Sequence, residues 1–341
     1  MGDDPRLAAP PGPSVERSDA GRPAAVDRPA AGVGTGRERP ATIGAAGRWA
    51  TARLDFAVGG GRTVLARQHV PYPVHVTRPF RLDAALPGLA TLYLQSASGG
   101  LYRGDDVGLE VDVGAAAAVH LTTQAATVVH DGRRVGARQR TAIRVGEGGF
   151  AAFTPDPLVL FPGAWLESRT EITLDGGAAA IVAEGICRHD PAGGDAPFDR
   201  FEATTIVRDA SGRVLVADRG GVDGADLTGA ASPLGPWRAF GTCLVLVGRS
   251  SEVPGGGSSP TGAAFLSPML AARLSPMLSA GLEAAASDRG CLAGASTLPN
   301  GAGLAVRLLA VEGGALARGL DAVFATAFAA LLGVPPAPRR K

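Results

Sequence analysis

The chain has 341 residues, a formal net charge of +1 and 45% hydrophobic residues. This balance argues against a general nucleic-acid binder, which needs an extended basic surface. No uncharged apolar stretch reaches the roughly 18 residues that would predict a membrane span. Lys341 is the only lysine, which excludes a phosphate-loop lysine or a Schiff-base lysine from the folded part.

The first 47 residues differ in composition from the rest. They contain no aromatic residue and are rich in alanine, glycine and proline. Such a stretch buries too little apolar surface to offset the entropy of ordering, so we expect a disordered tail. It has the pattern of neither a signal peptide nor a myristoylation site, which indicates a cytoplasmic protein. Three widely spaced cysteines fit reduced thiols in that compartment.

The middle of the chain repeats one pattern of strand, small turn and strand. Val111, Ile143, Ile172 and Ile206 recur at intervals of 32, 29 and 34 residues, which is within the range of stacking repeats. Small turns between alternating runs predict hairpin-like units and an elongated stack of strands. The runs are LDFAVGGGRTVLA (54–66), LEVDVGAAAAVHL (109–121), IRVGEGGFAAF (143–153), ITLDGGAAAIVA (172–183) and IVRDASGRVLVA (206–217).

The clearest alternation lies in AWLESRTEITL (164–174). It predicts one face inward and one outward. The predicted inward face carries Leu166, Ser168, Thr170, Ile172 and Leu174, and the other face carries Trp165, Glu167, Arg169, Glu171 and Thr173.

Helices are predicted near the C-terminus. Two Ser-Pro pairs eight residues apart are typical of helix starts and predict helix near 266–287, with a break or restart at Pro276. Apolar residues at helical spacing predict a second helix over 314–332, and both should pack on the strands. We therefore divide the chain into a tail (1–47), a β-rich domain (48–335) and a flexible C-terminus (336–341).

The stretch SASGGLYRGDD, residues 96–106, combines three glycines with two aspartates. It has neither the lysine of a phosphate loop nor the spacing of a dinucleotide fingerprint. We interpret it as a turn that needs glycine at Gly99, Gly100 and Gly104. A purely structural loop and a partner-facing loop remain open. On the partner-facing interpretation, Asp105→Ala should keep near-normal stability.

Other candidate residues are weaker. Cys187 and His189 are the only closely spaced soft metal ligands, although C-x-H lacks the second half of a site. The carboxylates of Glu167, Glu171 and Glu184 would serve a β-solenoid hydrolase or lyase only if they converged. A basic cluster is interpreted either as a solvated strand edge, which the sequence favours, or as a contact for an acidic partner. It comprises Arg133, Arg134, Arg138 and Arg140.

Three motifs in order resemble the UreD (UreH) family of urease accessory proteins. They are GGLYRGD (99–105), LTTQAAT (121–127) and TPDPLVLFPGAWL (154–166). The resemblance extends from about Arg53 to Leu309. The family's proline before the glycine pair is Ser98 here, and its lysine after the second motif is Val128.

The resemblance implies a maturation factor that is not an enzyme. Such a protein would bind urease apoprotein subunits and, with UreF-like and UreG-like partners, assist nickel insertion, without nucleic-acid or membrane partners. It implies a β-helix-like strand stack and no tightly bound cofactor, with nickel only in transit. Cys187 and His189 would be transient nickel ligands, and Glu184 would lie on a polar path. A β-solenoid binding module or a carbohydrate-active enzyme is the alternative. Residues of a partner-binding or conformational loop would be Gly99, Gly100, Arg103, Gly104, Asp105, Thr122, Thr123 and Gln124.

Overall fold

The computed structural model describes residues 47–229, 232–248 and 276–339. The predicted tail up to residue 46 and the predicted helical residues 266–275 lie outside the described residues. The described residues form two β-sheets and two α-helices, together with short 3-10 turns at Gly224–Leu227 and Pro299–Gly301. The predicted mainly β fold with C-terminal helices is therefore confirmed.

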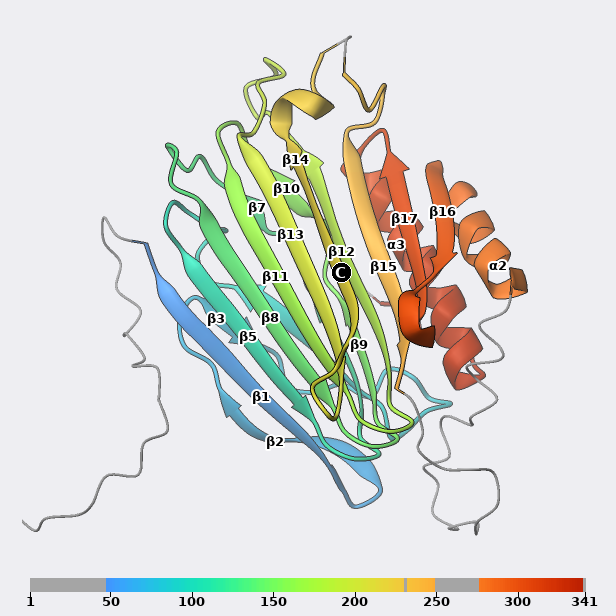
Figure 1. The fold of residues 1–341 in the computed structure, drawn as a ribbon. Helices are drawn as coiled ribbons and strands as arrows, with labels where there is room; N and C mark the ends of the chain where they lie inside the picture. The colour runs from blue at the N-terminus through green and yellow to red at the C-terminus, as the bar shows by residue number, and fades with distance from the viewer. Residues whose placement is uncertain (1–46, 230–231, 249–275, 340–341) are drawn as a thin grey trace, which may run out of the picture. The chain divides into compact units, whose positions relative to one another are not determined.

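The first sheet, here sheet A, has the strand order β14-β13-β11-β8-β5-β1-β2 within the described residues. Strands β1, β5, β8, β11 and β13 are parallel, and β2 and β14 flank them as antiparallel edges (Figure 1). Its strands are β1 (Trp49–Gly59), β2 (Arg62–His69), β5 (Asp106–Val113), β8 (Ala137–Val145), β11 (Trp165–Leu174), β13 (Arg200–Asp209) and β14 (Val214–Asp223).

The second sheet, sheet B, has the main order β16-β17-β15-β12-β9-β6-β4-β3, with β10 beside β12 and β7 beside β10. Strands β4, β6, β9 and β12 are parallel. Its strands are β3 (Val74–Val76), β4 (Ala90–Ser96), β6 (Ala118–Thr123), β7 (Val128–Val129), β9 (Phe150–Thr154), β10 (Leu158–Leu160), β12 (Ala179–Arg188), β15 (Ala239–Val247), β16 (Cys291–Thr297) and β17 (Gly303–Ala310).

The chain alternates between the sheets, so the repeat is a coil and not a row of hairpins. Residues 54–66 and 206–217 form hairpins, as predicted. The other three predicted hairpins are wrong, because β5 and β6, β8 and β9, and β11 and β12 lie in different sheets. Their turns stack on one another: the Gly146 N–H donates to the Val113 carbonyl, and the Asp175 N–H donates to the Val145 carbonyl. Small turn residues permit both connections, so the local sequence does not distinguish them.

The repeat spacing places equivalent residues side by side. Val111 pairs with Ile143, and Ile143 with Ile172, as the intervals predicted. Ile206 does not continue this row, because Ile172 pairs with Val207 and Ile206 pairs with Glu171. A shift of one residue moves a strand side chain to the opposite face. Val207 is therefore buried in the core, while Ile206 is only half-buried.

An apolar core joins the facing sides of the two sheets. Val111 and Ile172 of sheet A belong to the same buried cluster as Leu121, Val182 and Leu244 of sheet B. The alternation predicted for 164–174 is confirmed, since its five inward residues are buried. These contacts make sheets A and B two layers of one domain.

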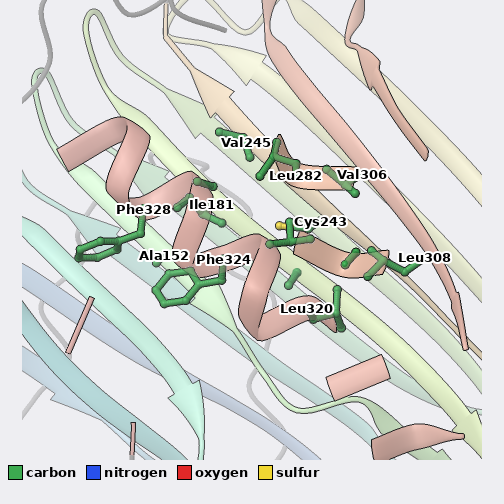
Figure 2. Close-up of a cluster of buried hydrophobic side chains, with 14 of the residues drawn as sticks. Ala152, Ile181, Cys243, Val245, Leu282, Val306, Leu308, Leu320, Phe324 and Phe328 are labelled. Carbon is green, nitrogen blue, oxygen red and sulfur yellow. The ribbon is translucent and has the colours of Figure 1, made fainter. Parts of the chain in front are cut away.

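The helices form a third layer on the other side of sheet B. Helix α2 (Pro276–Ser287) begins at the predicted restart, and helix α3 is Gly313–Leu332. Phe324 and Phe328 of α3 share one buried cluster with residues of sheet B such as Ala152 and Ile181 (Figure 2). Helix α3 is long and apolar enough to cross a membrane by length and composition. Here its apolar face is buried in the core.

The segment after α3 is attached to the core. The Ala337 N–H donates to Asp83 Oδ1 at 2.6 Å, and Arg339 forms an ion pair with Asp83 at 2.9 Å. Arg339 Nε also donates to Nδ1 of the buried His120 at 3.0 Å. Residues 337 and 339 of the predicted flexible C-terminus are therefore fixed by hydrogen bonds.

The two neighbouring isoleucines give a matched test of the register. We expect Ile172→Ala to lower the free energy of unfolding by about 2–5 kcal/mol, because it leaves a cavity in the core. Ile206→Ala makes the same chemical change on the opposite face and should cost less than half as much. Urea denaturation of both variants measures the difference. Equal losses would contradict the register.

Candidate functional site

The loop 96–106 joins β4 in sheet B to β5 in sheet A. Its three glycines adopt positive φ values of 72° at Gly99, 134° at Gly100 and 71° at Gly104. A side-chain carbon at Gly100 would stand 2.2 Å from the Val128 carbonyl oxygen. The loop thus needs glycine both for its conformation and for close backbone packing.

Asp105 closes this loop from inside the protein. Its side chain is buried, with 1% of the residue exposed. The carboxylate accepts hydrogen bonds from the Arg48 backbone N–H at 2.8 Å, from Arg48 Nε at 3.0 Å and from the Tyr102 backbone N–H at 2.8 Å. The hydrogen bond to Asp105 raises the pKa of Arg48. The carboxylate therefore faces Arg48 and not a partner.

This geometry replaces the expectation that Asp105→Ala has near-normal stability. We predict that Asp105→Ala lowers the free energy of unfolding by about 3–5 kcal/mol, because Arg48 stays buried without its counter-charge. Asp112→Ala, an exposed aspartate on the outer face of β5, is the control and should cost less than about 1 kcal/mol. Chemical denaturation decides between them. An Asp105→Ala protein as stable as the control would contradict a structural role.

The residues of the second motif gather at the end of β6. Thr122 is buried and donates to the Thr154 carbonyl at 2.7 Å. Thr123 Oγ1 accepts the Asp156 N–H at 2.8 Å, while Gln124 is exposed. Thr123 and Gln124 line one cavity of about 320 Å³, together with two glycines of the 96–106 loop. The structure thus brings Gly99, Gly100, Thr123 and Gln124 together, whereas Arg103, Gly104, Asp105 and Thr122 do not line this cavity.

A polar layer crosses the interior between the sheets. On sheet A, Thr141, Thr170, Thr205 and Asp218 stand next to one another on successive strands. Each threonine of this row lies two residues before a buried apolar residue. These are Ile143, Ile172 and Val207, which pair with one another. On sheet B, the neighbours Glu184, Thr242 and Arg307 form the opposing row.

The two rows are bonded across the gap between the sheets. Ser168 of sheet A donates its hydroxyl to Glu184 Oε1 of sheet B. Arg307 of sheet B forms an ion pair with Asp218 of sheet A at 2.8 Å and donates to Thr242 Oγ1 at 3.3 Å. The Ser168–Glu184 bond lies inside the protein, where an unpaired polar group would cost free energy on folding. The Arg307–Asp218 pair lies at the edge of the layer, because Arg307 is exposed.

Two cavities meet in this layer. The larger reaches the surface residues Gly99 and Gln124, and a smaller one of about 50 Å³ is lined at its far side by Asp218 and Arg307. Glu184 lines both cavities, as do Thr170 and Gly185. Both cavities are lined mainly by apolar groups, so water inside them would bind at polar residues such as Glu184 and Thr170. Glu184 therefore stands where a route from one cavity to the other would pass.

The surroundings of Glu184 favour its protonated form. Burial raises the pKa of Glu184, the nearby negative charge of Asp218 raises it further, and the hydrogen bond from Ser168 opposes both. Burial is the largest of these effects because a carboxylate loses hydration inside the protein. A cation that enters the layer would favour release of this proton.

The raised pKa predicts a pH dependence of stability. In the unfolded chain Glu184 loses its proton near the ordinary pKa of 4.5, whereas the folded protein keeps it to higher pH. Stability conferred by the protonated group is thus complete below 4.5 and declines as pH rises toward the folded pKa. Glu184→Gln cannot titrate, so its stability relative to the unmodified protein should rise across this window and then level off.

Urea denaturation at a series of pH values above 4.5 measures this difference. Glu167→Gln is the matched control, because Glu167 lies on the exposed face of β11 and pairs with Arg138. This control separates the pH dependence caused by burial of Glu184 from the effect of removing any one glutamate. A pH-independent stability difference between Glu184→Gln and the unmodified protein would contradict a raised pKa.

The other predicted carboxylates do not join Glu184. Glu167 and Glu171 lie on the outer face of sheet A, where they pair with Arg138 and Arg169. Glu184 points between the sheets. The convergence that a solenoid hydrolase would need is therefore missing for these three residues.

Cys187 and His189 lie away from the polar layer. Cys187 belongs to the helix-side core, whereas Glu184 faces the space between the sheets. Burial raises the pKa of the Cys187 thiol to about 11, which disfavours the thiolate that binds metals. His189 is exposed and lines a surface pocket with Cys187. Among the described residues, no three His, Cys, Asp or Glu side chains are grouped so that they could hold a metal.

Comparison with known proteins identifies the family. The family model described as UreD urease accessory protein matches residues 48–341. The chain belongs to the UreD family. It is 48% identical over 295 residues to urease accessory protein UreD 1 of Methylorubrum extorquens (strain PA1), covering 86% of this chain and 92% of that protein.

More distant relatives agree. UreD 3 of Bradyrhizobium sp. (strain ORS 278) is 47% identical, with 86% of this chain and 96% of that protein covered. UreD 1 of Pseudomonas syringae pv. syringae (strain B728a) is 30% identical, with 85% and 95% covered. The predicted family is therefore confirmed. UreD proteins are accessory proteins by name, which also supports the prediction that the chain is not an enzyme.

Sequence reasoning named Glu184 as a candidate but did not name its neighbours in the polar layer. Asp218 and Arg307 stand 34 and 123 residues beyond Glu184 in the sequence. Strand pairing brings Arg307 into the row of Glu184, and the packing of sheet A on sheet B brings Asp218 to the same cavity. One signal was present: Ser168 and Thr170 occupy predicted inward positions of an otherwise apolar face. Polar residues at inward positions are the pattern to look for.

Proposed function

We propose that this UreD family member binds urease apoprotein and, with UreF-like and UreG-like partners, assists nickel insertion in the cytoplasm. Membership of the family supports a role in urease maturation. The observation that carries the nickel part of the proposal is Glu184, which lines both cavities of the polar layer. Nickel is the cargo here and not a resident cofactor.

The chemistry of the layer suits an ion in transit. Threonine hydroxyls and one carboxylate are weak oxygen ligands for Ni²⁺, which binds more tightly to imidazole and thiolate. A closed site with four strong ligands would retain the ion. Glu184 can release its proton as the cation arrives and take up a proton as it leaves, so no net charge remains buried.

The Cys187–His189 pair contributes less to this proposal. Cys187 lies on the opposite face of β12 from Glu184, and its thiol pKa is raised. A nickel ion held there would lie outside the polar layer. Transient binding by this pair therefore stays a separate prediction.

Reconstitution with purified urease apoprotein, the accessory proteins and nickel tests the role of Glu184. We expect Glu184→Gln to slow urease activation by about tenfold or more, because the amide cannot take on negative charge beside the cation. Glu167→Gln changes the same residue type on the outer face and should activate urease at the normal rate.

Binding must be measured beside activation. Glu184→Gln should still bind urease apoprotein, since its side chain lies between the sheets. Normal activation by Glu184→Gln would rule out a nickel route past this residue. Binding by the unmodified chain without any activation would favour the alternative of a plain binding module.

A further inference from the structure

The structure divides the predicted basic cluster into two halves. Arg138 pairs with Glu167 at 3.0 Å, and Arg140 pairs with Asp106 at 2.8 Å. Arg133 and Arg134 are exposed, and in the described part of the chain their side chains form no ion pair or hydrogen bond. Arg138 and Arg140 therefore fit the interpretation as a solvated strand edge. The positive charges of Arg133 and Arg134 remain available to bind a partner.

The two unpaired arginines occupy a turn that suits other residues. The Val135 N–H donates to the Gly132 carbonyl at 2.8 Å and closes a four-residue turn. Its central residues have φ values of 46° at Arg133 and 66° at Arg134. A turn with positive φ at both positions favours Asn-Gly. Arginine at both positions disfavours the folded turn, and such unfavourable positions often serve function.

An aromatic stack lies beside this turn. The Tyr102 and His130 rings are parallel, with centroids 4.3 Å apart and an interplanar angle of 8°. The Arg48 guanidinium lies 5.0 Å from the Tyr102 ring centroid, and Phe161 packs edge-on against His130 at 5.5 Å. These contacts fix the Tyr102 ring, yet 43% of the residue is exposed.

Backbone hydrogen bonds hold His130 against the 96–106 loop and the turn against Gly163, two residues beyond Phe161. The His130 N–H donates to the Leu101 carbonyl, and the Gly132 N–H donates to the Gly163 carbonyl, both at 2.9 Å. Val135 adds apolar surface, with 48% exposed. We define the arginine–aromatic patch as Tyr102, His130, Arg133, Arg134, Val135 and Phe161.

We propose that the arginine–aromatic patch binds an acidic segment of a protein partner in urease maturation; this rests on the proposed function for the partner's identity. Arginine pairs with carboxylates through two parallel hydrogen bonds. The rigid aromatic rings and Val135 accept an apolar side chain between those carboxylates. Nucleic acid fits less well, because the nearby arginines of sheet A are neutralised by acidic neighbours.

The patch adjoins the surface end of the larger cavity. His130 Nε2 lies 3.2 Å from the Gly99 carbonyl oxygen, a hydrogen-bond distance. Gly99 also lines the larger cavity. A partner bound at the patch would therefore stand beside the surface end of that cavity.

The test uses the full chain and a turn variant that keeps the fold. Arg133→Asn with Arg134→Gly installs the preferred turn residues, so this variant should unfold at a higher temperature than the unmodified protein. Arg138→Gln with Arg140→Gln is the control, because it removes the same charge from the ion-paired half. The probes, without nickel, are urease apoprotein, the UreF-like and UreG-like proteins singly, and a synthetic peptide with glutamates around one phenylalanine.

We expect the unmodified chain to bind the peptide and at least one protein probe, with an association rate that falls as salt is added. The turn variant should bind both about tenfold or more weakly and lose most of this salt dependence. Tyr102→Ala should weaken binding several-fold. The control pair and Glu184→Gln should bind like the unmodified chain.

Full-strength binding by the turn variant overturns the proposal, as does an equal loss in the control pair. Tighter binding of a single-stranded DNA oligomer than of every protein probe would assign the patch to nucleic acid and overturn it also. Binding of the peptide but of no maturation protein would support the patch chemistry and count against the proposed function. Failure of the patch proposal can thus be distinguished from failure of the proposed function.

Discussion

The register between parallel strands decides what each inward side chain of this protein meets. Each passage of the chain through sheet A and sheet B adds one strand to each, and equivalent residues fall into rows. Ile143 and Ile172 share one row, while Thr141 and Thr170 share the next, about 7 Å along the strands. Two residues along each strand therefore separate the apolar core from the polar layer.

This arrangement explains how a polar layer can lie between the sheets of a β protein without separating them. Apolar clusters between the two sheets include Ile172 in one and Leu166 in another, and the layer contributed by Ser168 and Thr170 lies between them on the same strand. Its hydroxyls and carboxylates are stabilised by cross-sheet bonds and by space for water. The sheets remain joined by the apolar rows.

The ionisable groups inside this protein have two different roles. The Arg48 and Asp105 side chains pair with each other and bond the backbone of Gly100 and Tyr102, so their role is to hold the 96–106 loop. Glu184 has a hydroxyl partner and cavities on both sides, so its charge can change. The loop connects these parts, because Gly99 contributes to the larger cavity and contacts His130 of the arginine–aromatic patch.

The sequence by itself determined the strand content, the inward face of residues 164–174, the glycine requirement of the 96–106 loop and the family. These follow from local patterns: alternation, turn residues and short motifs. It also singled out Glu184, whose place on a polar path stays a prediction. The tertiary structure alone decided that three turns cross between sheets, because a small turn between strands has the same composition in both connections.

Only the tertiary structure also decided which charges are available. Four arginines close in sequence are alike as residues, yet strand pairing gives Arg138 and Arg140 ion-pair partners, whereas the Arg133 and Arg134 side chains have none among the described residues. Likewise, Asp105 resembles an exposed turn aspartate until the buried Arg48 is seen beside it. Charge acts through space, so its partners depend on contacts between residues far apart in the chain, which a single sequence does not record.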